Sequence, residues 1–291
     1  MVRLVVAGVA GCALFIGTQD RPTFRLAART VYIYATVQGS DGRLVTDLAR
    51  DDFEVFDNNN RQPITVFDND PQKITVAVMF DMSNSMAAEH PRIRDAAIAL
   101  VQALWPEDRA RIGSFGMEVA ISPFITSDKP TLLRVIDEEL WPGWATPLWH
   151  ATETAMKTLD EEPGRRVVLL FTDGDDSAFL VPGSLGQVRA HAERGAFMIY
   201  AAGLESNGLT GDMRHLAADT GGGHFLVRDE DDLGKTFAQV VEELHHQYVI
   251  GFSTEATDGK SHTLTIRTKR AGTKVRGRRS YIASTDPGGA P

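Results

Sequence analysis

The apolar residues of this chain follow two different periods. Between residues 24 and 70 they recur at every second position, the spacing of a strand with one buried face, most clearly at Val31, Ile33, Ala35 and Val37. The same spacing returns between residues 248 and 283. In between, short apolar runs alternate with longer segments whose apolar residues are three to four apart, as on one face of a helix. The sequence therefore predicts a central α/β region flanked by two β regions.

The pattern of apolar residues in the central region predicts a regular alternation of strands and helices. Strands are expected at 74–80, 111–116, 119–121, 167–172, 196–201 and 225–227. Helices are expected near 91–105, after Pro130, after Pro147, and near 184–194, 212–219 and 231–246. Strands separated by helices predict a doubly wound, mostly parallel sheet with helices on both faces, a Rossmann-like α/β fold.

The two flanks predict a second structural unit. Each alone is too small to bury much apolar surface, so we expect them to pair into one small β-sandwich, with the α/β domain inserted between its halves. In the second flank, one long strand is expected at 273–283. The basic residues from Lys269 to Arg279 are expected on the solvated face of an edge strand, where charge discourages edge pairing. The expected division is a signal segment at 1–20, sandwich parts at 24–70 and 248–283, the α/β domain at 71–247, and a disordered tail at 284–291.

The first residues bear on the compartment. One positive charge at Arg3 precedes an uncharged, largely apolar stretch from Leu4 to Gly17, the layout of a short secretory signal and too short to span a membrane comfortably. We therefore expect export to the periplasm, the cell surface or the medium, with no stable transmembrane span in the mature chain. Cys12 follows Val9-Ala10-Gly11 as in lipoprotein signals, but the apolar residues after it disfavour lipid anchoring.

Composition excludes several classes of function. The net charge of −9 and the absence of an extended basic stripe argue against a nucleic-acid binder. Cys12 is the only cysteine, which excludes an intramolecular disulfide and metal sites built from several thiolates.

Two buried strands of the predicted sheet end in a carboxylate. Asp81 follows strand 74–80, and Asp173 follows strand 167–172. Ligands of open α/β sheets bind at the carboxyl ends of the strands, so the two acids are expected in one pocket.

Hydroxyl groups accompany these two carboxylates. Ser83 and Ser85 lie in the turn after Asp81, and Thr146 precedes a predicted helix. Carboxylate and hydroxyl oxygens suit a hard divalent cation such as Mg²⁺, with Mn²⁺ or Ca²⁺ as alternatives.

At residues 74–250 the sequence resembles the von Willebrand factor type A domains. Their metal-ion-dependent adhesion site (MIDAS) consists of an Asp-x-Ser-x-Ser turn, a Thr in a Gly-rich loop and an Asp before Gly. The matching positions here are Asp81, Ser83, Ser85, Thr146 and Asp173. The resemblance implies that these residues bind Mg²⁺ and that an acidic residue of a protein partner completes the coordination. Where family members often have Gly-Gly before the Thr, this chain has Trp144-Ala145. The flanks look like those of bacterial exported proteins described as "VWA-related".

Enzymatic alternatives lack essential residues. A phosphatase of the haloacid dehalogenase type needs a second Asp where this chain has Ser83. The chain contains neither the Gly-x-Ser-x-Gly of serine hydrolases nor the phosphate loop of ATPases. We therefore expect a non-enzymatic, metal-dependent protein-interaction or adhesion module. The second hypothesis is a structural or assembly component of the cell envelope whose metal only stabilises the fold.

Three further groups of residues are candidates for smaller roles. Trp144 is a candidate partner contact on a loop. Asp175 and Asp176 either support the metal ligands or form an exposed acidic loop. Adjacent residues of a helix face different ways, so His245 and His246 are expected on a solvated helix face rather than in a zinc site.

Overall fold

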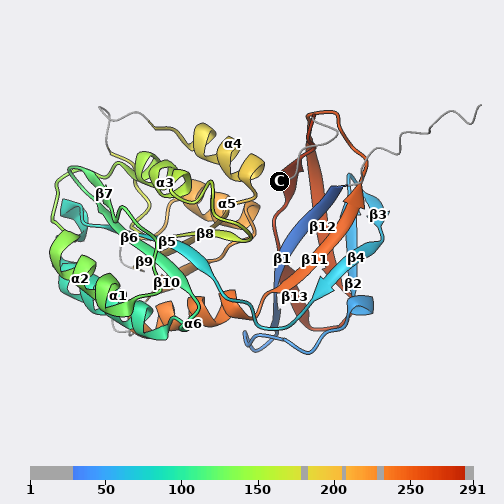
Figure 1. Ribbon diagram of the computed structural model, residues 1–291, viewed down its shortest axis with the longest axis horizontal. Coiled ribbons are helices and arrows are strands. Elements are labelled where there is room, and N and C mark those ends of the chain that lie inside the picture. The colour runs from blue at the N-terminus through green and yellow to red at the C-terminus, as the bar shows by residue number, and fades with distance from the viewer. Residues whose placement is uncertain (1–28, 178–182, 205–207, 228–232, 286–291) are drawn as a thin grey trace, which may run out of the picture.

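The computed structural model describes residues 29–177, 183–204, 208–227 and 233–285. An α/β domain and a β-sandwich lie side by side (Figure 1). The expected signal segment, Cys12 and residues 286–291 of the expected tail lie outside the described residues.

The α/β domain is built on a six-stranded sheet with the order β10-β9-β8-β5-β6-β7. All neighbours are parallel except β6 and β7, which are antiparallel. The strands are β5 (Thr75–Asp81), β6 (Arg109–Phe115), β7 (Val119–Ile121), β8 (Arg166–Phe171), β9 (Met198–Leu204) and β10 (His224–Val227).

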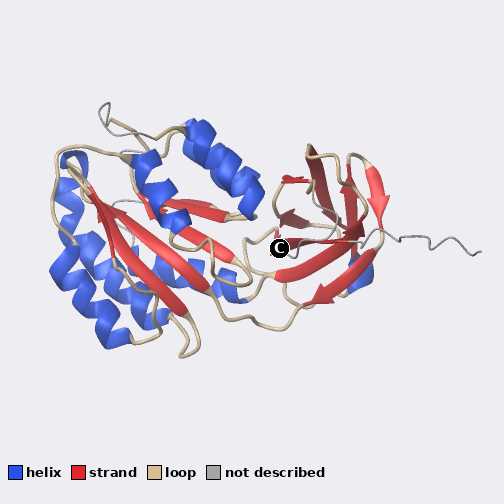
Figure 2. Ribbon diagram, turned by 45° about the horizontal axis from the view of Figure 1, so that its top comes forward, coloured by secondary structure: helices blue, strands red, loops and turns tan. Residues whose placement is uncertain are grey.

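Helices cover both faces of this sheet (Figure 2). The helices are α1 (His90–Ala103), α2 (Lys129–Glu139), α3 (Leu148–Lys157), α4 (Leu185–Gly195), α5 (Gly211–Asp219) and α6 (Leu233–His245). Successive residues of β5 point to opposite faces. Val78 and Phe80 join the core under α1, α2 and α6, while Ala77 and Met79 join the core under α3, α4 and α5. Because both faces of the strand are buried, its sequence is continuously apolar from Val76 to Phe80.

The β-sandwich consists of two four-stranded antiparallel sheets, β13-β1-β11-β4 and β14-β12-β2-β3. Each sheet combines strands from both flanks of the α/β domain. The first flank provides β1 (Arg29–Gly39), β2 (Phe53–Asp57), β3 (Asn60–Gln62) and β4 (Ile64–Asp68). The second flank provides β11 (Tyr248–Thr254), β12 (Ser261–Thr268), β13 (Thr273–Arg276) and β14 (Ser280–Ile282). The predicted fold class, a doubly wound α/β domain with a small flanking β-sandwich, is confirmed.

The prediction of a single strand at 273–283 is wrong, because this segment forms two strands that belong to different sheets. β13 pairs with β1, whereas β14 pairs with β12. The connection passes close to β1, where a Cβ on Gly277 would lie 2.8 Å from Ile33 Cγ2. The Arg279 amide then donates to the Asp219 carbonyl (2.9 Å). The connection thus contacts the end of α5 in the other domain.

A buried polar network joins the two domains around Glu243 of α6. Its Oε1 accepts hydrogen bonds from Tyr200 Oη (2.6 Å) and Thr36 Oγ1 (3.2 Å), and it forms an ion pair with Arg276. Gln247 donates to both Thr36 Oγ1 (3.0 Å) and Tyr200 Oη (3.1 Å). The network includes residues of both domains, so it fixes how they sit against each other.

Two predictions of solvated faces are wrong at this junction. The guanidinium of Arg276 pairs with buried Glu243 instead of facing solvent. His245 is fully buried, 2.7 Å from Asp108 Oδ2 through Nε2 and stacked on Trp105. Only His246 of the pair is partly exposed. The helical spacing of apolar residues predicted α6 correctly. It could not show that the end of this helix is buried by contacts with distant parts of the chain.

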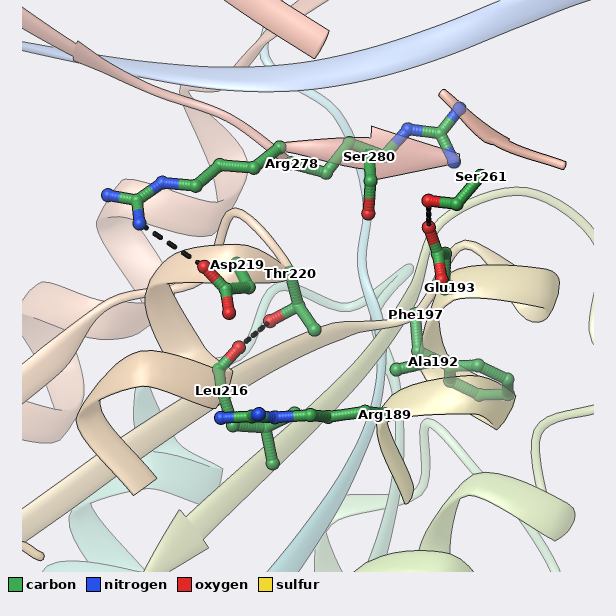
Figure 3. A pocket seen from close by; sticks show the side chains of 11 residues that line it. Arg189, Ala192, Glu193, Phe197, Leu216, Asp219, Thr220, Ser261, Arg278 and Ser280 are labelled. Carbon is green, nitrogen blue, oxygen red and sulfur yellow. Dashed lines mark hydrogen bonds and ion pairs between the residues drawn. The ribbon is translucent and has the colours of Figure 1, made fainter. Parts of the chain in front are cut away.

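A cleft of about 310 Å³ lies where α4 and α5 face the sandwich. Figure 3 shows residues of both domains around it. Arg279 forms an ion pair with Asp219 across the junction (3.2 Å), and Ser261 Oγ donates to Glu193. These pairs lie at the open side of the junction, while the network around Glu243 lies inside.

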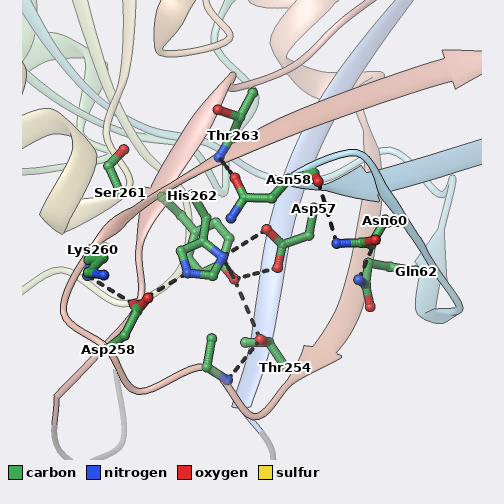
Figure 4. A network of polar contacts seen from close by, with 12 residues as sticks. Asp57, Asn58, Asn60, Gln62, Thr254, Asp258, Lys260, Ser261, His262 and Thr263 are labelled. Atoms are coloured by element: carbon green, nitrogen blue, oxygen red, sulfur yellow. Dashed lines mark hydrogen bonds and ion pairs between the residues drawn. The ribbon is translucent and has the colours of Figure 1, made fainter.

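A second polar network lies within the sandwich, around His262 of β12 (Figure 4). Its Nδ1 is 2.8 Å from Asp57 Oδ1, and its Nε2 is 3.3 Å from Asp258 Oδ1. Tyr281 Oη donates to the other oxygen of Asp57 (2.9 Å). Burial lowers the pKa of His262, but the hydrogen bonds and charges of Asp57 and Asp258 outweigh it and raise the pKa above 6.5.

This raised pKa makes the contribution of His262 to stability depend on pH. A histidine whose pKa is raised in the folded state stabilises the fold most below its unfolded pKa, and that part is lost as pH rises through the folded value. His262→Gln should therefore lower the melting temperature by roughly 2–4 °C at pH 6, as for a loss of about 1 kcal/mol, and by less at pH 9. Thermal unfolding followed by circular dichroism measures this. The control is His215→Gln, the same change at an exposed histidine. If His262→Gln lowered the melting temperature equally at both pH values, the prediction would be contradicted.

Candidate functional site

The ends of β5 and β8 lie together at one edge of the sheet. The two strands are parallel neighbours, with Phe80 opposite Phe171. Asp81 ends β5 and is fully buried, and Asp173, two residues beyond β8, is half-buried. Because the strands run parallel, both acids lie at the carboxyl ends of neighbouring strands.

The Asp81 carboxylate has two protein hydrogen-bond donors. The Ser83 amide donates to Oδ1 (3.0 Å), and Thr172 Oγ1 donates to Oδ2 (2.7 Å). The Gly174 amide in turn donates to Thr172 Oγ1 (3.0 Å). Thr172 thus links Asp81 to the loop that carries Asp173. Sequence reasoning missed this role, although Thr172 directly precedes Asp173.

Burial raises the pKa of Asp81 to about 6. Hydrogen bonds from Ser83 and Thr172 lower it but do not offset the loss of solvation, and Asp173 raises it further. The two donors to this carboxylate, the Ser83 amide and Thr172 Oγ1, are uncharged. Burying a carboxylate among uncharged donors is costly, so the site fits a bound cation.

The two serines after Asp81 lie side by side. Ser83 Oγ and Ser85 Oγ are 3.1 Å apart, with Ser83 buried and Ser85 exposed. Residues Asn84–Glu89 form a 3₁₀ helix that leads into α1. His90 Nε2 lies 3.3 Å from the Ser83 carbonyl and supports this turn.

Thr146 lies in a loop joined to the end of β8. Its amide donates to Ser177 Oγ and its carbonyl accepts from the Ser177 amide, both at 3.1 Å. Its side chain is buried. Asp176 accepts from the Leu148 amide at the start of α3 (2.9 Å), so it orders this loop. Asp175 is exposed.

Trp144 extends from the same loop and is 70% exposed. The preceding Gly143 packs so closely that a Cβ there would lie 2.1 Å from the Met117 amide nitrogen. The Gly143 amide donates to the Met82 carbonyl (2.8 Å). The loop is thus attached to the turn after Asp81, with Trp144 facing solvent.

The five candidate ligands offer two carboxylates and three hydroxyls. In the part of the chain that the structure describes, no three His, Cys, Asp or Glu side chains are grouped for metal binding. Such a donor set suits Mg²⁺, which retains several water ligands and needs few carboxylates.

Comparison with known families identifies the α/β domain. Residues 76–175 match the model of the von Willebrand factor type A domain, a range that contains all five candidate ligands. Over these residues the α/β domain matches the von Willebrand factor type A domain, and the predicted resemblance is confirmed there. Domains of this family are often adhesion or protein-interaction modules and are commonly non-enzymatic.

Two solved structures with TM-scores above 0.5 show the same fold at low sequence identity. A von Willebrand factor type A protein from Catenulispora acidiphila is 12% identical with a TM-score of 0.54, over 90% of this chain and 76% of that one. Proximal thread matrix protein 1 from the mussel byssus is 17% identical with a TM-score of 0.53, over 66% of this chain and 51% of that one. BatB from Bacteroides thetaiotaomicron is 19% identical with a TM-score of 0.46, over 59% of this chain and 98% of that one. A comparison with curated proteins finds no match.

Proposed function

We propose that this chain is a non-enzymatic module that binds a protein partner through a divalent cation, Mg²⁺ in the first instance. The cation is held by Asp81, Ser83, Ser85, Thr146 and Asp173. A carboxylate of the partner completes its coordination. Membership of a family of interaction domains supports this function.

The observation that carries the proposal is the environment of Asp81. Its carboxylate is fully buried, with hydroxyl groups and a second carboxylate nearby. A bound cation would offset the cost of this burial and the repulsion from Asp173. It would also supply a local positive charge that binds a partner carboxylate.

The charge of the whole protein limits how the partner is recognised. A net charge of −9 repels an acidic partner at a distance. Affinity therefore depends on direct contact with the cation and on apolar contacts around it, including Trp144.

The proposed location is outside the cytoplasm. The proposal rests on the signal-like pattern of the first 20 residues, which lie outside the described part of the chain. Among the helices that the structure describes, none has the length and apolar character needed to cross a membrane.

Calorimetry tests the metal part of this proposal. Titration of Mg²⁺, Mn²⁺ and Ca²⁺ into the chelator-treated protein should show a single saturable site. Circular dichroism of the metal-free protein should show a folded domain, because apolar cores rather than the cation hold the sheet. Unfolding in chelator would instead support the alternative of a metal that only stabilises the fold. Absence of cation binding would overturn the proposal.

A further inference from the structure

Large apolar side chains gather beside the turn that carries Asp81. Trp141 is 71% exposed, Trp144 70% and Met117 57%. Gly143 lies between the two tryptophans in sequence and packs on the Gly116–Met117 backbone, so the segments that carry the three side chains lie next to each other. An exposed apolar patch of this kind marks an interaction surface, and tryptophan is enriched among residues that dominate binding energy.

A hollow of about 440 Å³, lined in part by Trp141, opens between the start of α1 and the end of α2. The volume is in the range of small-molecule sites and accommodates one large side chain. Its lining is mainly apolar and includes Met82, His90, Pro91, Leu140, Trp141 and Pro142.

The hollow lies next to the turn that carries three of the candidate metal ligands. Met82 lines the hollow and directly follows Asp81. The imidazole of His90, also in the lining, lies 3.3 Å from the Ser83 carbonyl. A ligand that contacts the cation can therefore place a neighbouring side chain in the hollow.

The charges around the site favour an apolar occupant on this side. At the hollow, Asp137 is neutralised by Arg94, with Nη1 2.7 Å from Oδ1. The loop after β8 instead carries the acidic Asp173, Asp175 and Asp176. A segment bound to the cation thus meets an acidic loop after β8 and, beside α1 and α2, a mainly apolar hollow whose charged residues Arg94 and Asp137 are paired.

We propose that the hollow receives a large apolar side chain from the same protein segment whose carboxylate binds the cation. This inference rests on the proposed function and specifies its partner: a segment with an acidic residue and an aromatic or large aliphatic residue a few positions away. The cation provides attraction to the carboxylate, and the hollow distinguishes this segment from other acidic sequences. Burying one such side chain contributes about 1.5–3 kcal/mol, which here is reduced by the entropy lost on ordering the ligand.

Synthetic peptides test this two-part recognition. The probes are fluorescently labelled Gly/Ser hexapeptides with one Asp and one Phe, the Phe placed one to three residues before or after the Asp. Parallel sets carry Ser in place of Phe, or Asn in place of Asp. Fluorescence anisotropy is measured with Mg²⁺ and with chelator. At one or more spacings, the Phe peptide should bind the Mg²⁺ form about tenfold more tightly than its Ser counterpart, as about 1.4 kcal/mol gives.

Protein variants assign that gain to the hollow. Trp141→Ser removes an exposed aromatic side chain from the lining of the hollow. This variant should bind the Phe and Ser peptides equally well and should keep its affinity for Mg²⁺. Trp144→Ser lies outside the lining and should retain most of the preference. The matched control is Leu226→Ser, which removes an apolar side chain exposed on β10 and should change neither quantity.

The outcomes separate this inference from the proposed function. If Asp peptides bind only with Mg²⁺ but Phe adds no affinity at any spacing, the inference is overturned and the proposed function stands. The same holds if Trp141→Ser leaves the preference for Phe intact. If the Asn peptides bind as well as the Asp peptides and chelator has no effect, the proposed function fails and this inference with it.

Discussion

Asp81→Asn should abolish Mg²⁺ binding, with a loss of at least about 100-fold in affinity, while the metal-free domain becomes more stable. The first effect follows because the variant lacks one of the two carboxylate ligands, and a neutral amide oxygen is a poorer ligand for a hard cation. Asn is nearly isosteric, and its oxygen can still accept a hydrogen bond from Ser83 or Thr172. Calorimetry of Mg²⁺ binding and thermal unfolding in chelator measure the two effects.

The stability gain of Asp81→Asn should depend on pH in a defined direction. An acid whose folded pKa is about 6, raised from 3.8, destabilises the metal-free fold once it ionises. The penalty is absent below about pH 4, grows between about pH 4 and 6, and levels off above that range on the order of 2–3 kcal/mol. The variant should therefore match the wild type at pH 4 and exceed its stability at pH 7.

The control for Asp81 is Asp175→Asn, the same change at an exposed position of the neighbouring loop. It should alter Mg²⁺ affinity only slightly, through a small change in local charge. If Asp81→Asn binds Mg²⁺ as tightly as the wild type, the assignment of the site is wrong.

Glu243→Ala should lower the free energy of unfolding by about 3–5 kcal/mol, the cost typical of breaking a buried ion pair. The variant leaves Arg276 without its anion and removes the acceptor for Tyr200 and Thr36. Urea unfolding followed by tryptophan fluorescence and circular dichroism measures the loss.

Glu242→Ala is a matched control, because Glu242 is the preceding residue of the same helix and its side chain is 60% exposed. It should change the free energy of unfolding by less than about 0.5 kcal/mol, as is usual for surface substitutions. A loss below about 1 kcal/mol for Glu243→Ala would show that the junction network contributes little to stability.

Much of the candidate site could be predicted from sequence because its residues are local to strand ends. Asp81, Ser83 and Ser85 lie within five residues after a strong apolar run, and Asp173 follows another such run. Parallel pairing of two buried strands then brings both acids to one edge. Thr172 was missed because a threonine at a strand end has no distinctive pattern, and only its hydrogen bond to Asp81 shows its role.

The chain by itself determined the order of strands and helices and the residues at the sheet edge, because these depend on local periodicity and on the alternation of buried positions. Tertiary structure alone decided the division of 273–283 into β13 and β14, and the burial of Glu243, His245 and Arg276. It also formed the hollow beside the turn after Asp81, whose walls come from that turn, from α1, and from the end of α2 with the segment after it. These features depend on contacts between residues far apart in sequence. From sequence alone, polar side chains on a helix or strand are predicted to face solvent. Here another domain packs against them and supplies their hydrogen-bond partners.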